Sequence, residues 1–295
     1  MRFLKSLKFD LLYLIAILFA PMAEFATYLE NELYDHLFRN AGYTSPTTVY
    51  AALFDTTAST ANLEAGTLTG EISGSAYART AITFGAPTNG LGSNSSAVTF
   101  PAASGGDWGT IRYMAIMDSS GTGVNVLMYT QLDSDVVIND GNQFQFNIGD
   151  IDADFKPAGS EISNDTSNEL YDHCLRNAAY GSPANVYLAM FTSTATSGEM
   201  DANTQTNEVT DANAYVRLAL TVTAPTDGAG SNSGDHAFAA ASGGNWGTLR
   251  FVAVVDSITH NGGAILAYTQ MDSDVVINDG NTLQFNSGDL DIQIQ

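Results

Sequence analysis

The feature that most constrains this chain is an internal duplication centred on its only two tryptophans. Residues 104–113, Ser-Gly-Gly-Asp-Trp-Gly-Thr-Ile-Arg-Tyr, return with few changes as residues 242–251, and an apolar run that ends in Asp118 or Asp256 follows each block. A glycine-flanked tryptophan before such a run predicts a turn, an anchoring aromatic side chain and a buried strand. The chain is therefore expected to contain two modules of one fold.

The repeat divides the 295 residues into four segments. They are an apolar leader at 1–22, a first repeat at 23–153, a linker at 154–160 and a second repeat at 161–295. Two modules of this length agree with the ordinary size of globular domains. A linker this short is expected to keep the two modules adjacent.

Each repeat is expected to begin with a short amphipathic helix. Thr27 and Glu30 match a capping box, and Leu29, Leu33 and Leu37 recur four residues apart. Residues 31–36, Asn-Glu-Leu-Tyr-Asp-His, recur letter for letter at 168–173. Cys174 replaces Leu37 in the second copy, which predicts a small buried apolar side chain and not a nucleophile. The Asp-His pair on this helix predicts a solvated face or a contact with a neighbouring subunit.

The segments that follow the helix predict strands. The runs 49–54 and 186–191 are apolar on both alternating faces, which is typical of a strand covered on both sides. We expect the helix to cover one face and a second sheet the other. Residues 55–74 and 192–213 are polar, differ most between the copies, and are expected to be exposed loops without a packing role. Each repeat is therefore predicted to be a β-sandwich with a short N-terminal amphipathic helix, in a mainly β chain.

The Asp-Gly pairs of the two repeats predict tight hairpins. Asp140-Gly141 and Asp279-Gly280 each separate two strand-like runs. Type I′ hairpin turns favour Asp-Gly because they need positive φ angles. The nearby carboxylates also suggest a hard cation such as calcium, although the full ligand pattern of a calcium loop is absent. The two interpretations, structural turn and calcium site, stay open for the candidate residues Asp133, Asp135, Asp140, Asp272, Asp274 and Asp279.

Composition and motif searches exclude several functions. The net charge of −22 repels phosphate backbones, so nucleic acid is not an expected partner. We find no nucleophile elbow, phosphate loop or Cys/His metal pattern, and predict no catalytic residue, no cofactor-binding residue, no cofactor other than the calcium considered above, and no enzyme activity. The strand arginines recur between the repeats and are expected to pair with nearby carboxylates; they are Arg79, Arg112, Arg217 and Arg250.

The leader leaves two interpretations open. Arg2, Lys5 and Lys8 precede an apolar run at 11–20, which resembles a secretory signal and is short for a membrane span. Met22 instead offers an ordinary start for the first repeat, so residues 1–22 could be an over-extended reading frame. In neither case is stable membrane insertion expected.

Several motifs resemble a known family. They are Tyr-x-Arg at 77–79, Phe-Pro-Ala-Ala at 100–103, the Trp-Gly pair, and the late Gly-Asp pairs at 149–150 and 288–289. In this order they resemble the small bacteriophage modules known as tail fibre or minor tail proteins. The resemblance covers each repeat nearly end to end, although the second copy has Ala239 where the first has Pro101.

The resemblance implies a structural virion protein of the tail fibre, minor tail or head exterior, assembled in the host cytoplasm. Other virion proteins are the implied partners, with a host-surface glycan as a further one. The duplication suggests a homo-oligomer such as a trimer, in which three chains occupy six similar positions. The alternative is an exported adhesin or carbohydrate-binding β-sandwich protein, secreted or held at the cell surface.

Overall fold

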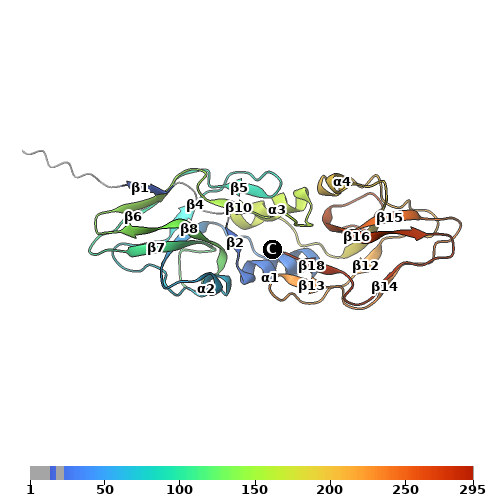
Figure 1. Ribbon diagram of the computed structural model, residues 1–295, viewed down its shortest axis with the longest axis horizontal. Helices are drawn as coiled ribbons and strands as arrows, with labels where there is room; N and C mark the ends of the chain where they lie inside the picture. Colours follow the sequence, from blue (N-terminus) through green and yellow to red (C-terminus); the bar gives the residue numbers. More distant parts are fainter. Residues whose placement is uncertain (1–13, 18–22, 295) are drawn as a thin grey trace, which may run out of the picture.

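The computed structural model of the chain describes residues 14–17 and 23–294. Figure 1 shows two β-rich modules that lie end to end, with the long helix of each module in the middle of the molecule. The predictions made for the leader fall outside the described residues, apart from 14–17. Two similar mainly β modules confirm the predicted fold class of two β-sandwiches, each with a short N-terminal helix.

The first repeat is built from a large sheet and two small ones. The large sheet has the strand order β2-β8-β7-β3-β4, and the small sheets have the orders β1-β9-β6 and β10-β5. Buried residues of the large sheet and of β6 and β9 share one apolar core. The elements are β1 (Leu14–Ile17), β2 (Glu24–Phe25), α1 (Thr27–Phe38), β3 (Val49–Asp55), α2 (Thr60–Glu64), β4 (Thr80–Ile82), β5 (Leu91–Ser93), β6 (Val98–Ala102), β7 (Gly109–Met117), β8 (Val126–Ile138), β9 (Gln143–Phe146) and β10 (Asp152–Asp154).

The second repeat has the same plan. Its large sheet has the order β12-β11-β15-β16, and its small sheets are the pairs β13-β18 and β14-β17. The register agrees too, because Gly109 pairs with Ile138 in the first repeat and Gly247 with Ile277 in the second. The elements are α3 (Asn164–Leu175), β11 (Val186–Thr192), α4 (Ser197–Asp201), β12 (Leu218–Leu220), β13 (Ala229–Ser231), β14 (His236–Ala237), β15 (Gly247–Val255), β16 (Ile265–Ile277), β17 (Gln284–Phe285) and β18 (Asp291–Gln293).

The outer face of the central strand is covered by a different helix from the expected one. Strand β3 is buried on both faces, as predicted, but its outer residue Phe54 belongs to a cluster with Leu63 of the short helix α2. Met200 of α4 has the same place beside Phe191 in the second repeat. The prediction that 55–74 and 192–213 are loops without a packing role was therefore wrong. One apolar residue on a single helical turn leaves no periodic pattern to detect.

The Asp-Gly turns connect different sheets and are not hairpins. Strand β8 pairs with β7, whereas β9, which follows the turn, pairs with β6 and β1. The amide of Asn142 donates to the carbonyl of Asn139, and Gly141 alone of the two central residues has a positive φ, of 86°. This combination is a type II turn. The predicted type I′ hairpin was wrong because the local rule does not specify which sheet the next strand joins.

The tryptophans anchor the repeats as predicted. The indole of Trp108 is buried, donates from Nε1 to the carbonyl of Ser75 at 3.0 Å, and packs edge-on against Tyr77 with ring centroids 5.3 Å apart. Trp246 makes the equivalent contacts with the carbonyl of Asn213 and the ring of Tyr215. A buried indole with a satisfied N–H fixes the loop before the strand to the strand that follows.

The repeated arginines pair with carboxylates, which confirms their predicted role. Arg79 binds Glu71, Arg112 binds Asp135, Arg217 binds Glu208 and Arg250 binds Asp274. The pairs differ in burial. The Arg217 and Glu208 side chains are 1% and 0% exposed, whereas those of Arg250 and Asp274 are 35% and 36% exposed. Arg217 also donates to the carbonyls of Ser257 and Gly262, so it fixes the adjoining loop.

This difference in burial predicts unequal effects of removing each arginine. Arg217→Met leaves the carboxylate of Glu208 buried without its cation and should lower the free energy of unfolding by roughly 3–5 kcal/mol. Arg250→Met, the control, opens a pair that water already screens and should lower the free energy of unfolding far less. Urea unfolding followed by tryptophan fluorescence measures both values. Equal losses in the two variants would contradict the prediction.

Candidate functional site

In the middle of the molecule, the long helix of each repeat packs against the opposite repeat. Helix α1 of the first repeat packs on β13 of the second, where the hydroxyl of Tyr34 lies against Gly230. Helix α3 of the second repeat reaches β5 of the first, where the hydroxyl of Tyr171 lies against Gly92. A Cβ atom at either glycine would overlap the tyrosine oxygen. The two repeats are therefore interlocked by equivalent contacts in both directions.

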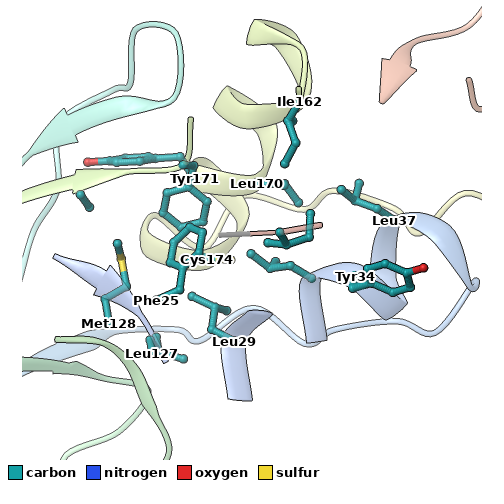
Figure 2. Packing of buried hydrophobic residues seen from close by; sticks show 14 of the residues in the cluster. Phe25, Leu29, Tyr34, Leu37, Leu127, Met128, Ile162, Leu170, Tyr171 and Cys174 are labelled. Carbon is teal, nitrogen blue, oxygen red and sulfur yellow. The ribbon is translucent and has the colours of Figure 1, made fainter. Parts of the chain in front are cut away.

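An apolar layer fills the space between the helices. Figure 2 shows Leu29 of α1 and Leu170 and Cys174 of α3 directed into the layer between the helices, and all three are buried. Phe155 lies within the predicted linker, and its ring packs edge-on against the rings of Phe25 and Tyr171 at centroid distances of 4.8 and 5.5 Å. Burial raises the pKa of the Cys174 thiol, so the thiolate is disfavoured and the residue acts as the apolar side chain that was predicted.

Matching hydrogen bonds join each helix to a turn of the opposite repeat. The side-chain oxygen of Asn31 accepts from the amide of Gly228 at 3.0 Å, and that of Asn168 accepts from the amide of Gly90 at 2.8 Å. Both glycines have positive φ angles, 69° and 83°, which residues with a side chain rarely adopt. Each asparagine thus recognises a backbone shape that a glycine makes possible.

The two histidines meet at the same interface. The rings of His36 and His173 stack with centroids 5.0 Å apart, and both residues are buried. The hydroxyl of Ser182 donates to the carbonyl of His36 at 2.8 Å, and that of Ser45 donates to the carbonyl of His173. The predicted solvated face was therefore wrong for these histidines, because they lie against the other repeat of the same chain; a contact with a neighbouring subunit stays a prediction.

The adjacent aspartates point elsewhere. Asp35 binds Arg39 and Asp172 binds Arg176, each one helical turn along its own helix. Asp and His next to each other on a helix face different directions, so they form no catalytic pair. The Nδ1 atom of His36 instead accepts from the amide of Tyr43 at 3.1 Å.

One buried carboxyl breaks the symmetry of the interface. Glu30 of α1 is 8% exposed and its stem lies against Gly228, whereas the corresponding residue of α3 is Ser167. Burial first, and then the negative charges of Glu64 and Asp227, raise the pKa of Glu30 to about 7. Burial and the neighbouring ring of His173 lower the pKa of His36 to about 4. Both groups therefore favour their uncharged forms in the folded protein.

The predicted cation ligands lie on the outer strands and turns, away from this interface. Asp135 and Asp274 bind arginines, and the guanidinium of each arginine lowers the pKa of its aspartate. Asp140 and Asp279 accept from the backbone amides of Gly105 and Gly243, both at 3.0 Å. Asp133 and Asp272 are exposed. Within residues 14–17 and 23–294 no three His, Cys, Asp or Glu side chains are grouped to hold a metal ion, and calcium binding stays a prediction.

The residues that matter most at the interface were not found from sequence. Asn31, Tyr34 and their copies belong to the repeated hexapeptide, but nothing in the sequence pairs them with the opposite repeat or singles out Gly92 and Gly230. Their common signal was identity between the copies at helix positions that an isolated amphipathic helix does not need. The partner of that surface lies in the opposite repeat, which no local pattern specifies.

Comparison with known proteins gives one result. A family model described as podophage GP4 fiber I protein gp80 matches the chain twice, over residues 24–154 and 161–293. No curated protein matches the chain. Within the described residues no helix has both the length and the apolar character needed to cross a membrane.

The tyrosine–glycine contacts predict a specific coupling between the repeats. Gly230→Ala should lower the free energy of unfolding by roughly 1–3 kcal/mol, because the new methyl group overlaps the Tyr34 hydroxyl. Tyr34→Phe alone should have little effect, since that hydroxyl is buried without a hydrogen-bond partner. Together the substitutions should lose less than the sum of the single losses. Strict additivity in this double-mutant cycle, measured by urea unfolding, would contradict the contact.

Glu30 predicts a stability change that depends on pH. Its pKa is about 7 in the folded protein, against a reference value of 4.5, so its contribution is present below pH 4.5 and is lost as the pH rises to 7. Glu30→Gln should therefore stabilise the protein by about 3 kcal/mol at pH 8 and by less than about 1 kcal/mol at pH 5. Exposed Glu169→Gln on α3 is the control and should show no such difference. A gain that is the same at both pH values would contradict the assignment.

Proposed function

Because the chain belongs to the podophage GP4 fibre I protein gp80 family, we propose that it serves as a two-module connector that docks other virion proteins on the outward faces of β8 and β16. Family membership makes it a structural protein of a phage tail fibre. In this proposal the exchanged helices hold the two modules in one fixed arrangement. The outer strands then present two copies of one docking surface.

The observation that carries the proposal is an exposed sequence kept identical in both repeats. Residues 133–142 and 272–281 have the same ten letters, although several of their side chains face solvent. Val137 and Val276, at matching positions, are 52% and 56% exposed. The loops at 55–74 and 192–213, by contrast, differ between the copies. The aspartates of this stretch have structural partners, since Asp135 and Asp274 bind arginines and Asp140 and Asp279 accept from backbone amides. The exposed valines have no such role, and an exposed valine kept in both copies is expected when both surfaces bind the same kind of partner.

The chemistry of this surface limits its partner. Next to each exposed valine lies an Arg-Asp pair, Arg112–Asp135 or Arg250–Asp274. A small apolar contact with a polar rim is the usual composition of a protein–protein interface. The strongly negative exterior favours a partner that is neutral or basic at the contact.

The helix exchange also bears on the predicted oligomer. Equivalent contacts in both directions are the mark of a two-fold interface, which closes on itself. Here both halves of that interface belong to one chain, so additional copies would have to associate through other surfaces. A trimer of chains stays a proposal, as does binding of a host-surface glycan. The exported-adhesin alternative depends on the leader, and the N-terminal residue determined by mass spectrometry decides it.

The docking proposal predicts the effect of charging both valines. The combined change Val137→Asp and Val276→Asp should leave the unfolding midpoint nearly unchanged, because the side chains are exposed. Incorporation into purified phage particles, measured by quantitative mass spectrometry, should fall at least tenfold. Ile258→Asp is the control, since Ile258 is 56% exposed in a loop that differs between the repeats, and its incorporation should be normal. Normal incorporation of the double variant would contradict the proposal.

A further inference from the structure

In the first repeat, a segment of the chain itself closes the gap between the large sheet and the small ones. The amide of Ala23 donates to the carbonyl of Asp152, the first residue of β10, and β2 pairs with β8. Further along the same edge, β1 lies parallel to β9, from Leu14 opposite Gln143 to Ile17 opposite Phe146. The residues before α1 thus reach the edges of three strands.

The same gap is open in the second repeat. Ile162 pairs with Ala267 of β16, but the amide of Ser160 turns back to the carbonyl of Pro157 and does not reach β18. A cavity of about 420 Å³ remains there, with Leu188, Val254 and Ile292 among its lining residues. Within the described residues β17 pairs with β14 alone, so no strand corresponds to β1.

Shorter side chains enlarge this gap. The pairing of Phe25 with Met128 in the first repeat corresponds to that of Ile162 with Ala267 in the second. Val252, which lines the cavity, takes the place of Met114, although Met190 opposite it is longer than the corresponding Leu53. The larger side chains of the first repeat are buried, whereas Ala267 is partly exposed. The second repeat therefore has room where the first is filled.

On the side of β17 away from β14, the backbone also offers groups that could pair with an added strand. The carbonyl of Leu283 accepts from the amide of Phe238, which places the backbone groups of Leu283 toward β14. Successive residues of a strand direct these groups to opposite sides, so the N–H and C=O of Gln284 face the open edge. The cavity is lined by β18 and not by β17. In the first repeat, however, residues 14–17 lie along β9 and Ala23 pairs with Ala153 of β10, so a strand on the same path in the second repeat would run from the edge of β17 to the cavity at β18. An unpaired strand edge is the arrangement that accepts an added strand.

We propose that the edge of β17 together with the cavity beside β18, here called the groove, is a binding site in the second repeat for an extended strand donated by another polypeptide. The strand lies parallel to β17, opposite residues 282–285, as β1 lies opposite the equivalent residues 143–146. Its chemistry follows from the groove. The floor is apolar, Glu161 and Asp291 lie among the lining residues, and no lysine or arginine does, so the strand is apolar and neutral or basic, like Leu-Ile-Ala-Ile at 14–17.

The numbers of leader strands and grooves in each chain indicate that the donor is a different chain. Each chain has one leader strand and two grooves, and the leader strand already lies on the first repeat of its own chain. Moving that strand to a neighbour would fill one groove and empty another, with no net gain in pairing. A donor from elsewhere fills the second groove without emptying the first.

The test uses the full chain and a fluorescent peptide with the sequence of residues 11–25, extended by two lysines for solubility. Fluorescence anisotropy should show saturable binding of one peptide per chain. Ala267→Met, which restores the residue type of the first repeat, should weaken binding at least tenfold by filling the groove. Gln284→Pro should do the same by removing the free N–H at the edge. Met128→Ala, the matched change in the first repeat, should leave the affinity within about twofold.

Unchanged unfolding midpoints in Ala267→Met and Gln284→Pro establish that both variants are folded. The absence of saturable binding, or binding that survives both substitutions, would overturn the proposal. Light scattering of the chain without peptide tests the leader of a second copy as donor. Concentration-dependent oligomers that disappear with Ile15→Pro would assign the groove to that leader and overturn the proposal of a different chain. A monomer supports the proposal.

Discussion

The arrangement of this molecule depends on one contact made twice, a tyrosine of each long helix set against a glycine of the opposite repeat. Tyr34 and Tyr171 each place a large side chain where Gly230 and Gly92 leave room for it. Neither helix would have this partner in an isolated repeat. The duplication therefore produced two interlocked domains and not two independent ones, because each half supplies an element that covers the other.

Charged side chains are distributed unequally between the interface of the two repeats and the exterior. The chain carries a net charge of −22, yet the interface is built from apolar side chains, asparagine amides and two buried histidine rings. Keeping charge out of the contact lets it form despite repulsion between two acidic modules. Glu30 is the exception, and the upward shift of its pKa shows that the folded protein disfavours its charge. The remaining carboxylates lie mostly on outer strands and loops, where water and arginines stabilise them.

Much of the fold could be predicted because its signals are local. Trp108, the leucines of α1 and the two-faced strand β3 each follow a short-range pattern, and the structure confirms each of them. The errors arose where the outcome depends on distant residues. The turn at Asp140-Gly141 has suitable turn residues, but the sheet that receives β9 is set by pairing with β6. A single apolar residue, Leu63, was not enough to predict helix α2. The partner of Tyr34 could not be predicted because it lies in the other repeat. The candidate cation ligands were recognised as a group in sequence, but arginines and backbone amides bind four of the six.

Cutting the linker tests the interlocking of the repeats most directly. A protease site inserted between Ala158 and Gly159, in an exposed part of the linker, allows the folded chain to be cleaved into its two repeats. Size-exclusion chromatography with light scattering then measures whether the halves remain together. Exchanged helices predict a one-to-one complex in buffer that separates only in denaturant. Halves that separate in buffer while each stays folded would contradict the interlocking.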